Sequence, residues 1–286
     1  MGKKFTFRQV DVFTDVPFKG NPVAVVHDAD NLTPDEMQAI ARWTNLSETT
    51  FVCAPTDSRA DYLLRIFTPT TELPFAGHPT VGSAHAVLRG GLRPKMPGLL
   101  VQQCAKGLIP VRVEGEKLFF ELPEPSLEEI PAEQLAQVAD ALGIQTREVA
   151  SGALINVGPV WLTLRLTNAD TVRCLKPDQA RVAAITPQGA VGVTVFGTEP
   201  AGSETQYEVR SFAPVQGVNE DPVCGSGNGC VAVLVEREKL SEEDSYVARQ
   251  GRSIGRDGRV EVRFGEANSI WVGGQAVTCV EGTLET

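Results

Sequence analysis

The sequence predicts an α+β fold of two similar halves, each with one buried central helix. Three observations lead to this prediction. Strand-like and helix-like segments alternate along the chain, their order occurs twice, and each half contains one small, apolar segment that begins with glycines. Two copies of a long repeat argue against a solenoid, which needs at least three repeats to bury its core. We therefore expect two halves that share one plan.

The repeat is visible in three pairs of segments. Residues 62–69 read YLLRIFTP and residues 207–214 read YEVRSFAP, an offset of 145. LTPDEMQAIA at 32–41 matches LKPDQARVAA at 175–184, at an offset of 143. AGHPTVGSA at 76–84 aligns with CGSGNGCVA at 224–232, at an offset of 148. The matches keep the same order, and the small drift in offset is typical of loop insertions. The order and spacing together favour an internal duplication.

The first half reads as strands around two helices. Thr33 and Glu36 form a capping box with Pro34 at the first helical position, which predicts a helix over 34–44. The segment from Gly77 to Gly90–Gly91 is small and apolar on nearly all sides, which predicts a buried central helix. The predicted strands lie within 9–29 (two strands around the turn 17–21), 49–55, 61–69 and 108–123 (a hairpin around Glu114–Gly115).

The second half repeats this order. Strands are expected within 155–166, 189–197 and 205–214, with a helix from about residue 177. The run CVAVLV at 230–235 alone would favour a strand because of its β-branched residues. Its place in the repeat predicts the second buried helix instead. Strands within 259–264 and 269–282 close the chain.

Composition limits the classes of function. The chain has 286 residues, 42% of them hydrophobic and 22% charged, as in an ordinary globular protein of one or two domains. A net charge of −10 repels phosphate backbones, so we expect no nucleic-acid partner. There is no apolar run of about 18 residues and no signal-peptide pattern, so we expect no membrane association and a cytoplasmic protein.

Polar residues that occur in only one half are the informative positions. Glu48 is opposite Val191, His78 is opposite Ser226, and Asp221 is opposite Leu73. A shared scaffold does not require these side chains, which makes them candidates for chemistry. Each also has a structural explanation: a solvated loop residue for Glu48, a packed histidine for His78, and a turn before Pro222 for Asp221.

Each half also offers a glycine-rich helix start. The free N–H groups at Gly77 and at Gly225–Ser226 would bind an anion such as a small carboxylate. Ser226 could instead be only an N-cap, and Cys224 only a small buried residue. The six cysteines form no CxxC pair, and GSGNG is neither a Walker loop nor a dinucleotide fingerprint. We therefore expect no metal and no cofactor.

Four segments resemble one known family. VDVFTDVPFKGNPVAVV, LSETTFV, FTPTTELPFAGHPTVGSA and NEDPVCGSGNGC are similar to segments of the PhzF-like phenazine-biosynthesis family, and the likeness extends from residue 7 to about 280. The resemblance implies a diaminopimelate epimerase-like fold, in which each half is a sheet wrapped around a central helix. It also implies halves formed by 1–118 plus 275–286 and by 119–274, with the active site in the cleft between them.

The family's chemistry is isomerisation by proton transfer without a cofactor. The resemblance places the proton-shuttling glutamate at Glu48, and it places a histidine, an aspartate and a serine of the site at His78, Asp221 and Ser226. Gly77, Gly225, Ser226 and Cys224 are then expected beside the carboxylate of a small-molecule substrate. A homodimer is a further possibility that the sequence leaves open.

Two alternatives remain open from the sequence. Cys224 stands where the phenazine enzyme has a threonine, and a cysteine at this place is an acid/base in the epimerase branch and in proline racemases. A Cys224-dependent racemase, epimerase or dehydratase is therefore possible, although the partner cysteine of those enzymes is replaced by Ala76. The helix start would lower the thiol pKa of Cys224. The second alternative is a non-catalytic protein that binds a small acid.

Overall fold

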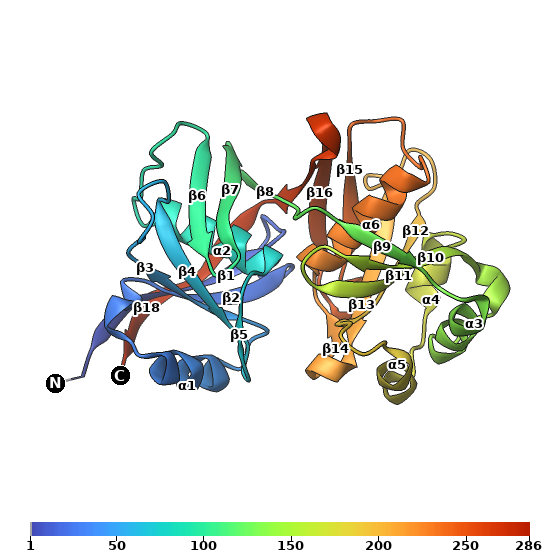
Figure 1. The fold of residues 1–286 in the computed structure, drawn as a ribbon, viewed down its shortest axis with the longest axis horizontal. Helices are drawn as coiled ribbons and strands as arrows, with labels where there is room; N and C mark the ends of the chain where they lie inside the picture. The colour runs from blue at the N-terminus through green and yellow to red at the C-terminus, as the bar shows by residue number, and fades with distance from the viewer. Residues whose placement is uncertain (1) are drawn as a thin grey trace. The chain divides into compact units, whose positions relative to one another are not determined.

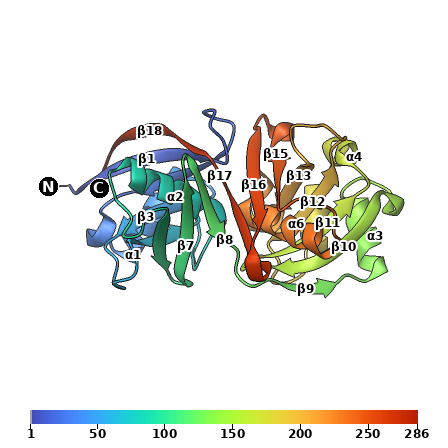
Figure 2. The same cartoon turned by 90° about the horizontal axis from the view of Figure 1, so that it is seen from above.

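The computed structural model describes residues 2–286, which form two compact units (Figures 1 and 2). Unit 1 comprises the residues up to Glu121 together with Gly273–Thr286, and unit 2 comprises Leu122–Val272. The predicted α+β class is confirmed, because each unit combines strands with helices. No helix within residues 2–286 has both the length and the apolar character needed to cross a membrane.

Unit 1 contains most of the first half of the chain and its last strand. Its elements are β1 (Lys4–Val12), β2 (Asn21–Val26), α1 (Pro34–Thr44), β3 (Thr49–Cys53), β4 (Tyr62–Phe67), β5 (Glu72–Leu73), α2 (Gly77–Arg89), β6 (Leu99–Cys104), β7 (Gly107–Glu114), β8 (Lys117–Glu121) and β18 (Ala276–Glu285).

Strands of unit 1 surround α2. β2 runs parallel to β3, β3 and β5 lie antiparallel to β4, and β4 runs parallel to β6. β18 returns along β1 as an antiparallel partner, from the pair Lys4 and Glu285 onward. Ten of the thirteen residues of α2 are buried, and Figures 1 and 2 show the helix among the strands of its unit. The predicted buried helix is therefore confirmed.

The capping box places α1 as predicted. The Thr33 hydroxyl accepts the Glu36 N–H at 3.2 Å, and the Glu36 carboxylate accepts the Thr33 N–H at 2.7 Å. The helix begins at Pro34, whose missing N–H costs nothing in the first turn. Met37, Ile40 and neighbouring side chains pack beneath it against Phe51.

Unit 2 repeats this order with additions. Its elements are β9 (Ser126–Glu129), α3 (Ala132–Ala141), β10 (Val149–Asn156), β11 (Val160–Leu166), α4 (Ala169–Cys174), α5 (Gln179–Ile185), β12 (Gly192–Thr198), β13 (Tyr207–Ala213), β14 (Val218–Asp221), α6 (Gly225–Arg237), β15 (Ser245–Gln250), β16 (Gly258–Phe264) and β17 (Ile270–Gly274), the last of which crosses the boundary back to unit 1. Short 3₁₀ turns lie at Ala29–Asn31, Thr146–Glu148, Pro214–Gln216, Arg252–Ile254 and Glu266–Asn268.

The strand pairing of unit 2 is the same as that of unit 1. β11 runs parallel to β12, β12 and β14 lie antiparallel to β13, and β13 runs parallel to β15. α6 has ten buried residues out of thirteen, like α2 (Figure 1). The segment CVAVLV is helical, as its place in the repeat predicted and against its β-propensity.

The registers show which residues of the two units are equivalent. Ile66 of β4 faces Leu73, and Ser211 of β13 faces Asp221, so Leu73 and Asp221 occupy the same place in their units. The predicted partner of Glu48 was wrong by one residue. Thr50 faces Ile66 and Thr194 faces Ser211, so Glu48 corresponds to Gly192 and not to Val191.

The helices of the second half differ from their prediction in two places, and the strands β9, β14 and β15 were not predicted. α3 was not predicted, because the first half has no counterpart to it. The single helix expected from about residue 177 is replaced by α4 and α5, and α5 begins at Gln179. The carboxylate of Asp178 accepts the Arg181 N–H and so caps α5, which explains why that helix begins after Asp178.

Candidate active site

The predicted site residues gather in two groups, one in each unit. In unit 1, Glu48 directly precedes β3 and His78 is the second residue of α2. Glu48 Oε2 lies 3.3 Å from His78 Nε2, and the side chains are only 15% and 6% exposed. The loop before β3 and the start of the buried helix thus bring these two groups together. A solvated loop residue, the structural explanation for Glu48, does not fit this burial.

Burial favours the neutral form of the His78 imidazole. Burial lowers the pKa of its imidazole to about 3, and a hydrogen bond from the ring to the Pro22 carbonyl raises the pKa by less. Since Nε2 faces Glu48, the ring hydrogen bonded to Pro22 is on Nδ1. Nε2 then presents a lone pair to the Glu48 carboxyl group.

Asp221 of unit 2 is the last residue of β14. Burial raises the pKa of its carboxyl group to about 6. Hydrogen bonds donated by the Cys224 thiol and the Val223 N–H lower the pKa, but by less than burial raises it. A carboxyl group with such a pKa exchanges protons near neutral pH. The equivalent residue in unit 1 is the apolar Leu73, so the scaffold itself does not need a carboxyl group here.

Cys224 caps helix α6. Its Sγ accepts the Gly227 N–H at 3.2 Å and lies 3.6 Å from Ser226 Oγ. The expectation that the helix start lowers the pKa of this thiol was wrong. Burial and the nearby Asp221 carboxylate raise the pKa well above its ordinary value, despite hydrogen bonds from Ser226 and Gly227. A thiol that stays protonated is a poor base, which weighs against the Cys224-dependent alternative.

Two residues near the second group were missed from the sequence. The Trp161 indole Nε1–H donates to Ser226 Oγ at 2.9 Å. Gln250 is fully buried and accepts the Cys224 N–H at 3.1 Å while donating to the Asp221 carbonyl at 3.0 Å. Comparison of the halves could have revealed Trp161. It faces Gly192, and the equivalent pair in unit 1 is Val23 and Glu48, so Trp161 is equivalent to Val23. Of these two side chains, only the indole can donate a hydrogen bond.

Gly77 and Gly225 are the first residues of α2 and α6, and both are buried. A Cβ atom on Gly77 would lie 2.6 Å from the Phe120 ring, so close packing already requires glycine there. Binding of a carboxylate by either helix start stays a prediction.

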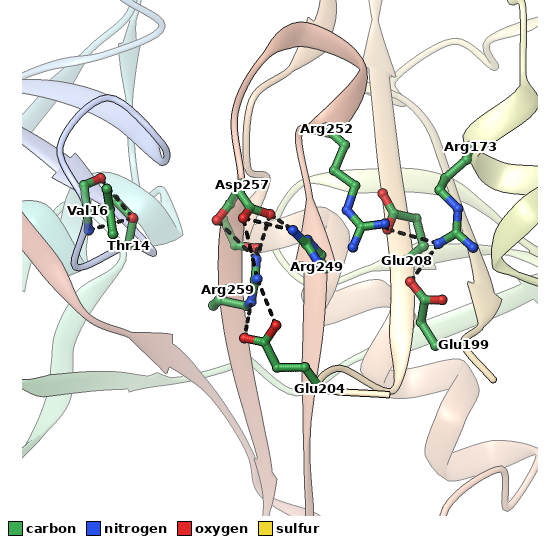
Figure 3. Close-up of polar contacts among 11 residues, drawn as sticks. Thr14, Val16, Arg173, Glu199, Glu204, Glu208, Arg249, Arg252, Asp257 and Arg259 are labelled. Carbon is green, nitrogen blue, oxygen red and sulfur yellow. Dashed lines mark hydrogen bonds and ion pairs between the residues drawn. The ribbon is translucent and has the colours of Figure 1, made fainter. Parts of the chain in front are cut away.

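A charged cavity lies elsewhere in unit 2. Its volume is about 310 Å³, and its lining includes Arg173, Arg249, Arg252, Glu199 and Glu204, none of them a predicted site residue. Figure 3 shows these side chains paired with one another and with neighbouring acids. Arg173 bonds Glu199 at 2.7 Å, and Arg249 bonds Asp257 at 2.5 Å. Because its charges are largely satisfied internally, we assign this cavity no catalytic role.

Metal-ligand geometry is also missing from the described residues. Within residues 2–286, no group of three or more His, Cys, Asp or Glu side chains is arranged to hold a metal ion. The six cysteines are free thiols, and those at 53, 104, 224 and 230 are buried.

Comparison with known proteins defines the class. The family model of the phenazine biosynthesis-like proteins, PhzC-PhzF, matches residues 10–282. The chain belongs to this family. It is 43% identical over 291 residues to "Antisense-enhancing sequence 1" of Schizosaccharomyces pombe, with 97% of each chain covered. It is 34% identical over 283 residues to the trans-2,3-dihydro-3-hydroxyanthranilate isomerase of Pseudomonas fluorescens, covering 96% of this chain and 97% of the relative.

Solved structures agree with this assignment. A Bacillus anthracis phenazine biosynthesis protein of the PhzF family has a TM-score of 0.87 and 25% identity, with 99% of each chain covered. A hydroxyproline epimerase from Agrobacterium vitis shares the fold, with a TM-score of 0.69 and 15% identity over 99% of this chain and 92% of that one. The sequence-based prediction of a PhzF-like isomerase with an epimerase-like fold is confirmed at the level of family, fold and enzyme class.

Proposed function

We propose that this protein is a cofactor-independent isomerase that moves a proton between carbon atoms of a small, carboxylate-bearing substrate. The observation that carries the proposal is the contact between Glu48 Oε2 and Nε2 of the neutral, buried His78. A proton shuttle must both accept and donate a proton. Glu48 can do both, since Nε2 of His78 can accept a hydrogen bond from the protonated carboxyl group.

The proposed reaction has two steps. The Glu48 carboxylate removes a proton from a substrate carbon, so that the C–H bond breaks, an O–H bond forms, and the electron pair enters the conjugated system of the substrate. Glu48 then returns the proton to a different carbon of that system. His78 stays neutral throughout, because burial keeps the pKa of its ring far below neutrality. Positioned acid–base catalysis of this kind contributes about 10²–10⁴-fold.

We assign the group in unit 2 to substrate orientation in the same reaction. Asp221, with its pKa raised to about 6, can donate to or accept from a heteroatom of the substrate. The helix start at Gly225 and Ser226 would hold the carboxylate. The relative from Pseudomonas fluorescens is named for a cyclic amino acid, trans-2,3-dihydro-3-hydroxyanthranilate, and we propose a substrate of this chemical class.

The test is deuterium incorporation in heavy water. The purified, chelator-treated protein is incubated with trans-2,3-dihydro-3-hydroxyanthranilate and with a panel of cyclic amino acids, and deuterium at carbon is followed by NMR. We expect exchange with at least one of them. Glu48→Gln should slow turnover by at least ~10³-fold, which corresponds to about 4 kcal/mol of barrier. Its affinity for the stable analogue 3-hydroxyanthranilate should change little, because the carboxylate of the ligand would be held by the helix start and not by Glu48.

The matched control is Glu72→Gln, an exposed carboxylate of the same unit that is paired with Arg65. It should turn over substrate like the wild type. Near-normal turnover by Glu48→Gln would show that another group transfers the proton. Activity that disappears on chelation and returns with zinc or magnesium would contradict the cofactor-independent mechanism.

A further inference from the structure

The side chain of Trp161 donates a hydrogen bond to the hydroxyl group of Ser226, a candidate site residue. It lies in β11 and is 2% exposed. Its Nε1–H reaches Ser226 Oγ at 2.9 Å from the neighbouring start of α6. Val23, the equivalent residue of unit 1, is fully buried and has no polar atom in its side chain. Packing alone therefore does not require an indole at this position.

The bond restricts what the Ser226 hydroxyl can do. An indole N–H is only a donor, so Ser226 Oγ must accept from Trp161. The hydroxyl hydrogen is then left to donate, either to Cys224 Sγ at 3.6 Å or to a ligand. The sulfur already accepts the Gly227 N–H, and the thiol hydrogen is directed to Asp221. An anionic oxygen is a better acceptor for Ser226 than this sulfur.

The start of α6 offers matching donors. The Gly227 N–H bonds the Cys224 thiol, and the Asn228 N–H bonds the Cys224 carbonyl at 3.0 Å. The N–H groups of Gly225 and Ser226 precede the first intrahelical bond and have no acceptor within the helix. Ser226 is half-buried, so part of this residue can contact a ligand at the helix start, while Gly225 is buried beside it.

We propose that Trp161 is a positioning residue, which holds the Ser226 hydroxyl as a hydrogen-bond donor and thereby makes the start of α6 selective for a carboxylate over a neutral amide. The inference rests on the proposed function for the identity of the ligand. It concerns binding and selectivity, and it does not depend on which group transfers the proton.

The test is a double-mutant cycle in ligand binding. Dissociation constants for 3-hydroxyanthranilate and for its neutral carboxamide are measured by calorimetry with the wild type, Trp161→Phe, Ser226→Ala and the double variant. Trp161→Phe keeps an aromatic ring but removes the N–H donor. We expect Trp161→Phe and Ser226→Ala each to weaken carboxylate binding about tenfold, with little effect on the carboxamide. The double variant should be no weaker than Ser226→Ala alone, because Trp161 acts through that hydroxyl.

Other outcomes overturn the proposal. If the two substitutions weaken binding additively, or weaken both ligands equally, Trp161 only packs the core. The same conclusion follows if the wild type does not prefer the carboxylate to the carboxamide. Thermal unfolding of each variant separates loss of fold from loss of selectivity. Because binding is measured without turnover, the test is informative even if Glu48→Gln proves active and the proposed proton shuttle is wrong.

Discussion

The same ion pair occurs in both units with different burial. Arg65 of β4 pairs with Glu72 of β5 at 2.8 Å, and these side chains are 26% and 39% exposed. Arg210 of β13 pairs with Glu220 of β14 at the same distance, but its side chains are 6% and 9% exposed. Each arginine also stacks over a phenylalanine two residues further on, with 5.2 and 5.0 Å between the guanidinium carbon and the ring centre.

The difference lies in what surrounds the pair. Arg210 also donates to the carbonyls of Val172 and Leu175, at the end of α4, at 3.2 and 3.0 Å. The residue that follows the glutamate is Leu73 in unit 1 and Asp221 in unit 2. One scaffold thus holds its short strand by a partly solvated pair in unit 1 and, in unit 2, by a buried pair whose arginine makes two further hydrogen bonds. The buried version holds the strand that ends in a candidate catalytic carboxyl group.

Removing the arginine should lower the free energy of unfolding much more for the buried pair of unit 2 than for the pair of unit 1. Arg210→Met leaves the Glu220 charge buried without its partner, and removal of one member of a buried pair typically costs about 3–5 kcal/mol. Arg65→Met removes a partly solvated pair and should cost about 0–1 kcal/mol. Urea unfolding of both variants at pH 7 measures the two free energies. Equal losses would mean that burial does not distinguish the pairs.

Glu208 allows a second comparison between the units. It lies two residues before Arg210, and the residue two positions before Arg65 in unit 1 is the apolar Leu63. Its side chain is 1% exposed and lies 3.5 and 3.6 Å from Arg173 and Arg252 (Figure 3). Burial raises the pKa of Glu208 to about 7, while Arg252, Arg173 and Arg249 oppose this shift. Above pH 7 the folded protein must hold an ionised carboxylate that burial disfavours.

Glu208→Gln should therefore change the pH dependence of stability. Below the ordinary pKa of 4.5, the carboxyl group is protonated in both states and contributes nothing. Between pH 4.5 and 7 the folded state keeps a proton that the unfolded state has lost, so the stability of the wild type falls as pH rises. The variant has no carboxyl group at this position and does not show this fall. The difference in unfolding free energy, variant minus wild type, should therefore increase between pH 4.5 and 7 by on the order of 3 kcal/mol and stay constant above pH 7.

Urea unfolding at pH 5, 6, 7 and 8 measures this difference. The control is Glu204→Gln, which removes a 72% exposed carboxylate from the same charged network and should show no such trend. Parallel curves for Glu208→Gln and the wild type would show that the arginines fully compensate the buried charge.

The repeat explains why much of the fold was predictable. α1 carries its own capping signal, and α6 could be recognised because a clear helix occupies the equivalent place. The one-residue error at Glu48 arose because the offset between halves changes within a loop, where sequence matches give no register. α3 has no counterpart in the first half, so the repeat contained no information about it.

The candidate site was predictable only as a set of residues. Glu48, His78 and Asp221 were identified because the other half has no polar residue, or a different one, at those places. The sequence could not show that burial makes His78 a neutral partner of Glu48. Nor could it show that burial outweighs the helix start at Cys224. Such effects depend on the atoms packed around a group, which a local motif does not contain.

The smallest expected effect concerns Cys224, whose equivalent in unit 1 is Ala76. Its thiol has a pKa well above the ordinary value, and its Sγ caps α6 through the Gly227 N–H. A serine hydroxyl can make the same cap and the same hydrogen bond to Asp221. Cys224→Ser should therefore keep at least a tenth of the activity, a loss below about 1.4 kcal/mol. Turnover and thermal unfolding are measured on one preparation, and alkylation of Cys224 in the wild type, followed at that residue by mass spectrometry, should be slow because the residue is 4% exposed, whereas the exposed Cys174 should react quickly. A loss above a thousandfold with the fold intact would make Cys224 an acid/base and would favour a thiol-dependent racemase or epimerase over the Glu48-centred isomerase.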